Sequence, residues 1–392
     1  MKKESKIQPG YKTSALGLIP LDWEVKTLEQ LCTIYVGRDL REENYSQSQN
    51  DEFQFPVYSN TVENEGLYGY YNYEEYSGES LTIVGRGAGL GRAFTKSGIY
   101  GAIGRLLVLF PKENVSAHYV TEYVNNKLNI HQESGGIPQL TGEQIAGYKI
   151  VMPQYAEQLA IASRLSTWDK VIQTTTQLIA QKELQKKWLM QQLLTGKKRL
   201  RGFKGKWGDV ELGDLLIYEQ PTNYLVKDTL YNDAYETPVL TAGKTFILGY
   251  TNEQNGICTD LPVIIFDDFT TSSKYVNFPF KAKSSAMKIL RPKHNVNLKF
   301  VYEAMQLMNY VVGGHERHWI SKFVYLTIPC PLPEEQIAIA NIFQTVDKEI
   351  QILQNKLDKL KEQKKGLMQI LLTGKKRLTV RTGLAPVPKK IK

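Results

Sequence analysis

The chain of 392 residues contains only three cysteines, Cys32, Cys258 and Cys330, which lie far apart and show no metal-ligand spacing. Their scarcity argues against a structural zinc site or a disulfide scaffold and is typical of a reducing compartment. Long apolar runs are also missing, and those present, such as Leu106–Phe110, have the length of a strand and cannot cross a bilayer. The N-terminal lysines precede no apolar signal segment. We therefore expect a cytoplasmic protein with no membrane segment.

Complete catalytic motifs are missing as well. Gly243–Thr245 has the end of a phosphate-binding loop, but Pro238 stands where that loop needs its first glycine. The glycine-rich run Gly85–Gly91 lacks dinucleotide-binding spacing, and Asn277–Phe280 lacks the first proline of an amino-methyltransferase motif. The five histidines form no metal or triad pattern, and Asp267–Asp268 is more typical of a solvated strand end or turn than of a nuclease site. We expect no catalytic residue, no metal and no cofactor in this chain.

What the chain does contain is an internal repeat. The eight residues Leu-Leu-Thr-Gly-Lys-Lys-Arg-Leu occur at 193–200 and return 178 positions later at 371–378. Glu-Gln-Leu-Ala-Ile-Ala at 157–162 has a close copy at 335–340, at the same offset. A shared register over more than forty residues indicates an internal duplication.

Each repeated segment predicts one long helix. Apolar residues recur at alternating steps of three and four, which is the heptad pattern of a coiled-coil seam. The first seam is Ile161, Leu165, Trp168, Ile172, Thr175, Ile179, Lys182, Lys186, Leu189 and Leu193, weakened by its three polar members. The second is Ile339, Phe343, Val346, Ile350, Leu353, Leu357, Leu360, Lys364, Leu367 and Leu371. An amphipathic helix on its own globule is the alternative, but two copies of equal length favour an antiparallel pair about a pseudo-two-fold axis.

The segments between the helices have a different composition. They are rich in Tyr, Phe, Val, Ile, Thr and Gly, with short apolar runs separated by turn residues. We predict α+β domains with curved, mostly antiparallel sheets. The predicted division is 1–152 and 201–330 for the globular domains, 153–200 and 331–380 for the helical regions, and 381–392 for a polar tail. Trp23 and Trp207 open the two domains and indicate that these are distant copies.

Charge and loop composition point to a polyanionic partner. The net charge is +9 and the pI about 9.1, with a basic cluster between Gln181 and Trp207. The glycine pairs at 135–136 and 313–314 are again 178 apart, but Ile-Pro-Gln follows one and His-Glu-Arg-His the other. Equivalent loops with different polar side chains would suit two readers of different base sequences. Lysine and arginine elsewhere would bind phosphates.

The candidate DNA-binding residues are polar or basic and follow short strands or glycines. They are Tyr58, Ser59, Asn60, Arg86, Arg92, Arg105, Gln139, Thr241, Lys244, Ser272, Ser273, Lys274, His315, Arg317, His318 and Lys322. At any single position a solvated loop residue is the competing interpretation.

The architecture resembles the specificity (S) subunit of type I restriction–modification enzymes. The resemblance rests on the helix openings Pro153–Ala162 and Pro331–Ala340, on both closing octapeptides, and on the alternation of two divergent domains with two similar helices. It implies that each domain reads one half of a bipartite double-stranded DNA target and that the helices set the gap. It also implies two methyltransferase (M) subunits, which bind S-adenosylmethionine and methylate adenine, and restriction (R) subunits, which use ATP and magnesium.

Two other functions remain open from the sequence. The chain could be a DNA-modifying enzyme with unrecognised motifs, which would bind S-adenosylmethionine or cleave DNA alone. It could instead be a structural coiled-coil scaffold with two protein-binding domains, which would show no DNA sequence preference.

Overall fold

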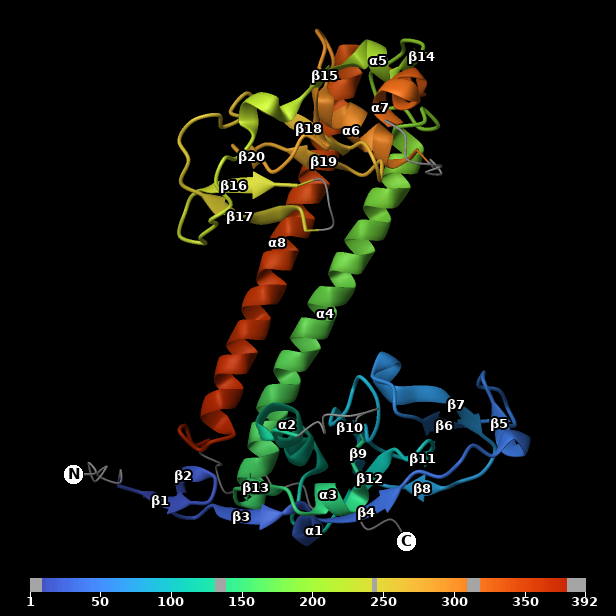
Figure 1. Ribbon diagram of the computed structural model, residues 1–392. Coiled ribbons are helices and arrows are strands. Elements are labelled where there is room, and N and C mark those ends of the chain that lie inside the picture. Colours follow the sequence, from blue (N-terminus) through green and yellow to red (C-terminus); the bar gives the residue numbers. More distant parts are fainter. Residues whose placement is uncertain (1–8, 131–138, 242–244, 309–317, 379–392) are drawn as a thin grey trace, which may run out of the picture. The chain divides into compact units, whose positions relative to one another are not determined.

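The computed structural model in Figure 1 describes residues 9–130, 139–241, 245–308 and 318–378. The chain forms two compact units, a first unit of residues 1–174 with 357–392 and a second unit of residues 175–356. Each unit combines one α+β domain with portions of both long helices. We call the α+β part of the first unit, up to Met152, the N-terminal head, and residues 208–330 of the second unit the C-terminal head.

The N-terminal head is built from short strands and three helices. In chain order they are β1 (Tyr11–Ser14), β2 (Gly17–Pro20), β3 (Glu24–Thr27), α1 (Leu28–Leu31), β4 (Cys32–Val36), β5 (Tyr45–Ser46), β6 (Phe55–Tyr58), β7 (Leu67–Tyr71), β8 (Tyr76–Ser77), β9 (Ser80–Ile83), β10 (Ala93–Lys96), β11 (Ile99–Ala102), β12 (Leu107–Pro111), α2 (Ala117–Lys127), α3 (Gly142–Ala146) and β13 (Lys149–Met152). One sheet has the order β10-β9-β12-β4 and another β5-β7-β6-β11-β8, with β6 and β11 parallel and the other pairs antiparallel. Helix α2 packs on β9 and β10 (Figure 1).

The C-terminal head repeats this topology. Its elements are β14 (Gly208–Glu211), α5 (Leu212–Leu215), β15 (Leu216–Glu219), β16 (Thr237–Leu240), β17 (Ile247–Thr251), β18 (Val263–Asp267), β19 (Ser273–Val276), β20 (Lys281–Ala282), β21 (Met287–Pro292), α6 (Leu298–Gln306), α7 (His318–Ser321) and β22 (Thr327–Cys330). The sheet β19-β18-β21-β15 matches β10-β9-β12-β4, and β17-β16-β20 matches β7-β6-β11, including the parallel pair. The α+β class and mostly antiparallel pairing expected from the sequence are confirmed.

Helices α4 (Tyr155–Leu193) and α8 (Pro333–Leu371) are each 39 residues long. Within the first unit the start of α4 and the end of α8 share one apolar core, which includes Ile161, Leu165 and Leu371. Within the second unit the end of α4 and the start of α8 share another, which includes Leu193 and Phe343. Opposite ends meet in both units, so the antiparallel coiled coil is confirmed. All residues of both predicted seams are buried or half-buried.

A glycine ends each long helix and is required there by its backbone conformation. Gly196 and Gly374 both have φ of +69°, the left-handed region that glycine adopts at helix ends. At Gly374 a Cβ atom would also lie 2.5 Å from Cγ of Pro20, so no larger residue fits. The octapeptide therefore carries both a helix stop and a contact with the N-terminal head.

Candidate functional site

Three loops of the N-terminal head meet at the side chain of Asn60, which follows β6. Its Oδ1 accepts a hydrogen bond from the backbone N–H of Gly85 at 2.8 Å, and its Nδ2 donates to the carbonyl oxygen of Gly104. Gly85 begins the loop between β9 and β10, and Gly104 lies in the turn between β11 and β12. One amide side chain thus joins the loops that follow β6, β9 and β11.

The segment after the undescribed residues 131–138 joins the same place through backbone contacts. Leu140 donates its N–H to the carbonyl of Gly85 at 2.8 Å, and Arg86 forms an isolated antiparallel bridge with Gln139. A Cβ at position 85 would lie 3.0 Å from the carbonyl oxygen of Arg105 and 3.1 Å from that of Leu140. Glycine therefore permits the close approach of these segments. The structure brings together Asn60, Arg86, Arg105 and Gln139, four of the predicted site residues.

Arg105 occupies an unusual backbone conformation. It has φ of +65°, directly after Gly104 with the same φ, and its N–H donates to the carbonyl of Gly37 at 3.1 Å. A non-glycine residue in this region costs roughly 1–2 kcal/mol. Arg86, Arg105 and Gln139 are all exposed, so the two arginines lie at the surface in loops whose backbones approach each other at Gly85.

An open groove lies beside Asn60 on the surface. It is lined by Gln47, Ser59, Asn60, Thr61, Glu63, Asn64, Leu67, Tyr68, Arg86 and Gly104. Ser59 was predicted from the sequence as a site residue, whereas Gln47, Asn64 and Tyr68 were not. Asn64 has φ of +45° within a 3-10 turn, η2 (Glu63–Gly66), and a positive φ is a signal that only the folded chain reveals.

Tyr58, the last residue of β6, is half-buried. The ammonium of the buried Lys96 lies 3.7 Å from the centre of its ring and donates to the carbonyl of Glu65 at 2.9 Å. Burial lowers the pKa of Lys96 to about 8 and raises the pKa of Tyr58. Arg92, at the other end of the glycine-rich loop, is exposed and lies over the ring of Phe94. Arg92 is therefore accessible to a partner, whereas Tyr58 is only partly accessible.

The C-terminal head presents fewer of its predicted residues within the described chain. Ser272 is exposed in the turn before β19, Lys274 is exposed within β19, and Ser273 accepts a hydrogen bond from Gln306 at 2.8 Å. Thr241 follows β16 and is half-buried, as is Lys322. Lys244, His315 and Arg317 lie outside the described residues. His318 is fully buried, so its ring is not displayed to a partner in this structure.

The sequence hypothesis of a solvated Asp267–Asp268 pair is corrected by the structure. The pair does end a strand, but both carboxylates are buried. Asp267 accepts hydrogen bonds from the N–H of Phe269 and the hydroxyl of Thr270 within the turn. Asp268 accepts from the N–H of Trp319 at 2.9 Å. These bonds replace the hydration that an exposed pair would have.

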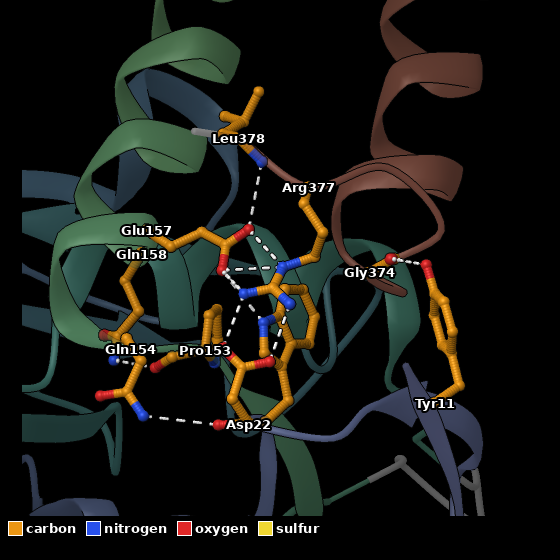
Figure 2. Close-up of polar contacts among 10 residues, drawn as sticks. Tyr11, Asp22, Pro153, Gln154, Glu157, Gln158, Gly374, Arg377 and Leu378 are labelled. Atoms are coloured by element: carbon orange, nitrogen blue, oxygen red, sulfur yellow. Dashed lines mark hydrogen bonds and ion pairs between the residues drawn. The ribbon is translucent and has the colours of Figure 1, made fainter. Parts of the chain in front are cut away.

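A cluster of polar bonds around the buried carboxylate of Glu157 joins the two helix motifs that repeat in the first unit (Figure 2). The carboxylate of Glu157, near the start of α4, accepts hydrogen bonds from Nε1 of Trp23 at 3.0 Å and from Arg377 at 2.8–3.1 Å. It also accepts the N–H of Leu378 at 3.1 Å. Arg377 in turn pairs with Asp22 at 2.7 Å. The opening motif of one helix is therefore bound to the closing motif of the other. We call this set of contacts around Glu157 the joint.

The neighbouring Gln158 completes this joint. Its Oε1 accepts from the N–H of Ser116 at 2.9 Å, and its Nε2 donates to the carbonyl of Pro153 at 2.9 Å. On the other side, the hydroxyl of Tyr11 donates to the carbonyl of Gly374 at 2.9 Å (Figure 2). The head, the start of α4 and the end of α8 are thus held by polar bonds as well as by their shared core.

The second unit contains the same joint. Glu335 accepts from Nε of Arg199 at 2.7 Å and from Nε1 of Trp207 at 3.1 Å. Gln336 accepts the N–H of Asn297 and donates to the carbonyl of Pro331. These residues are the counterparts of Glu157, Arg377, Trp23 and Gln158 in the repeat. The sequence identified the repeated motifs but not that each opening motif binds the other helix's closing motif.

The lysines of the seams are ion-paired in both units. Lys364 contacts Asp169 at 2.7 Å and Glu122 of α2 at 3.5 Å. Its counterpart Lys186 contacts Asp347 at 2.7 Å and Glu303 of α6 at 3.1 Å. In the second unit Lys299 also pairs with both acids. Lys364 and Lys186 therefore tie each head to the coiled coil, which explains why the heptad pattern is interrupted at these two positions. Lys182 instead joins the two long helices, because it pairs with Glu349 of α8 at 2.7 Å.

One carboxyl group in each of these two clusters, Glu122 and Asp347, has a shifted pKa, and the two shifts are in opposite directions. Burial raises the pKa of Glu122 above its ordinary value of 4.5, despite the nearby Lys364. Burial acts the same way on Asp347, but hydrogen bonds from Lys186 and Lys299 outweigh it and hold the pKa of Asp347 below 3.8. The stability due to Asp347 is present above its ordinary pKa and is lost as pH falls through the folded value. That due to Glu122 is present below its ordinary pKa and is lost as pH rises through the raised value.

Matched substitutions should separate the two carboxyl groups. We expect Asp347→Asn to lower the free energy of unfolding at about pH 7 by about 1 kcal/mol, a modest value because the side chain is 35% exposed. Glu122→Gln should leave the free energy of unfolding at about pH 7 unchanged or raise it. Urea unfolding at about pH 7 and about pH 3 checks this, and the deficit of Asp347→Asn should shrink in acid. Equal losses for both variants at neutral pH would contradict the assignment.

The described residues contain no group of three or more His, Cys, Asp or Glu side chains that could hold a metal ion. Burial raises the pKa of Cys32 to about 12 and also raises the pKa of Cys258 and Cys330, which disfavours the thiolate form that metals bind. Among the helices of this part of the chain, none is long and apolar enough to cross a membrane.

The architecture consists of two α+β heads with the same strand order and two long antiparallel helices, α4 and α8, to which each head is joined. The family described as the type I restriction modification DNA specificity domain matches residues 20–184 and 204–362. The chain belongs to this family, as the sequence predicted.

Relatives and a solved structure agree with this assignment. The chain is 49% identical over 161 residues to the EcoR124I/EcoR124II specificity subunit of Escherichia coli, which covers 38% of this chain and 39% of that relative. It is 25% identical over 95% of its length to a protein of Methanocaldococcus jannaschii described as the MjaX type I restriction enzyme specificity subunit, of which 97% is covered. The crystal structure of a type I restriction–modification S subunit from M. genitalium has the same fold, with a TM-score of 0.67 over 89% of this chain and 96% of that one at 14% identity.

Proposed function

We propose that this specificity subunit recognises a bipartite DNA target, with one half-site read by each head. The proposed division is 1–152 and 201–330 as target-recognition domains, 153–200 and 331–380 as spacer helices that set the gap, and 381–392 as a tail. The observation that carries this proposal is that the two heads have the same strand order and the same joint with the long helices but differ in their exposed loops. A duplicated frame with divergent loops is what two different half-sites require.

The exposed side chains have the chemistry for base and phosphate contacts. In the N-terminal head Arg86 and Arg105 can bind guanine edges or phosphates, and Gln139 can bind adenine. In the C-terminal head Ser272, in the turn before β19, and Lys274, within β19, are exposed. A good bidentate base contact contributes about 1–3 kcal/mol of discrimination, whereas phosphate contacts give salt dependence without sequence preference.

The proposed partners are double-stranded DNA, two methyltransferase subunits and, in the full complex, restriction subunits. In this proposal the partner subunits carry adenine methylation and ATP-dependent cleavage, and this chain carries no cofactor. The raised thiol pKa values and the structural use of Asp267 and Asp268 support a non-catalytic role. We place the complex in the cytoplasm.

A map of methylated adenine in host DNA tests the function. With this gene intact we expect one split motif, two short defined halves around a fixed gap, and we expect it to disappear on deletion. Replacing residues 201–330 by the corresponding domain of another specificity subunit should change one half only. An unchanged map in cells with an active methyltransferase subunit would reject the proposal and favour a protein-binding scaffold.

A further inference from the structure

We infer that Asn60 is a positioning residue for the half-site read by the N-terminal head, and that it acts through Arg86 and Arg105. This inference rests on the proposed function. Both polar atoms of the Asn60 amide are bonded within the protein, to Gly85 and Gly104, so its role is to fix the loops beside it.

The two bonds require an amide side chain of this length. The N–H of Gly85 needs an acceptor and the carbonyl of Gly104 needs a donor, both within reach of one residue after β6. Aspartate keeps the acceptor but loses the donor, and it places a carboxylate against the carbonyl oxygen of Gly104. Alanine supplies neither group.

The bonded glycines are each followed by an exposed arginine. Gly85 precedes Arg86, and Gly104 precedes Arg105, whose backbone is held in the left-handed region. The position of each guanidinium therefore depends on a backbone atom that Asn60 fixes. Bidentate base recognition depends on such placement, and a shift of about 1 Å is enough to impair a site.

The same head provides a matched control in Asn125. Its amide makes the same kind of bridge, with Oδ1 accepting the N–H of Ala93 at 2.8 Å and Nδ2 donating to the carbonyl of Ala93 at 2.9 Å. Both asparagines are half-buried. However, Asn125 joins α2 to β10, whereas Asn60 joins the loops that carry Arg86 and Arg105. Arg92 precedes Ala93, but its own backbone bonds hold it, with its N–H donating to the carbonyl of Gly89 and its carbonyl accepting the N–H of Val84, both at 2.9 Å. Asn125→Asp thus removes a comparable side-chain hydrogen bond at another place.

The test uses the full chain together with its methyltransferase subunits. The split motif of the wild type is mapped by adenine methylation, and binding of the purified complex is measured on duplexes with one base changed in either half. We expect Asn60→Asp to reduce discrimination in one half-site roughly tenfold and to leave the other half-site unchanged. Asn125→Asp should leave discrimination in both halves as in the wild type, even if it lowers the melting temperature.

The outcomes separate this inference from the proposed function. A wild-type complex with no split motif would reject the proposed function itself. A split motif that Asn60→Asp leaves unchanged would reject the positioning role. Equal relaxation by Asn60→Asp and Asn125→Asp would also reject it, because general loosening of the head would then explain the effect. Asn60→Ala, which introduces no charge, should relax the same half-site as Asn60→Asp.

Discussion

Replacing Glu157 with alanine should lower the free energy of unfolding of the first unit by about 3 kcal/mol. The carboxylate is 5% exposed and accepts bonds from Trp23, Arg377 and Leu378. Its removal leaves the indole N–H of the fully buried Trp23 without that partner, and the guanidinium of Arg377 then keeps its ion pair with Asp22 but not that with Glu157. Urea or guanidinium unfolding of the purified chain, followed by tryptophan fluorescence, measures the effect.

An exposed ion pair in the same head serves as the control for Glu157. Glu24 contacts Lys26 at 2.7 Å, but both side chains are largely exposed. Glu24→Ala should therefore change the free energy of unfolding by no more than about 0.5 kcal/mol. A loss for Glu157→Ala as small as that for Glu24→Ala would show that the joint between α4 and α8 contributes little to stability.

The long helices were predictable because their signals are local and repeated. Heptad spacing predicted the seam, and the glycines of the two octapeptides predicted the helix ends. The contact between Glu157 and Arg377 was not predictable, because the two residues lie 220 positions apart. No local pattern states which closing motif an opening motif will bind, since both copies have the same sequence.

The candidate site was predicted as a set of residues, without their separate roles. Arg86, Arg105 and Gln139 are exposed and close together, as a binding surface would require. Asn60 has the same polar chemistry, yet its amide bonds the backbone of two other loops. Strand order decides which loops meet, and composition predicts strands without their order. The lysines of the seams are similar: their acidic partners on α2 and α6 come from distant parts of the chain.

The repeat also predicts that a chain ending after residue 202 will form a homodimer. Such a chain keeps the N-terminal head, α4 and the first octapeptide but lacks α8. Its Glu157 would lose Arg377, and its Asp169 would lose Lys364. A second copy offers replacements at the corresponding positions. Lys186 in α4 corresponds to Lys364 in α8, and Arg199 after α4 corresponds to Arg377 after α8.

Two such copies could satisfy each other's joints and bury both seams, whereas one copy alone would expose its seam to water. Light scattering of the shortened chain should give twice the monomer mass, and Arg199→Glu should weaken the dimer roughly tenfold or more by placing a carboxylate against Glu157 of the other copy. With methyltransferase subunits, the dimer should direct methylation to an inverted repeat of one half-site. A monomer, or a dimer insensitive to Arg199→Glu, would show that the two octapeptides are not interchangeable, because the joint would then need features that only α8 supplies.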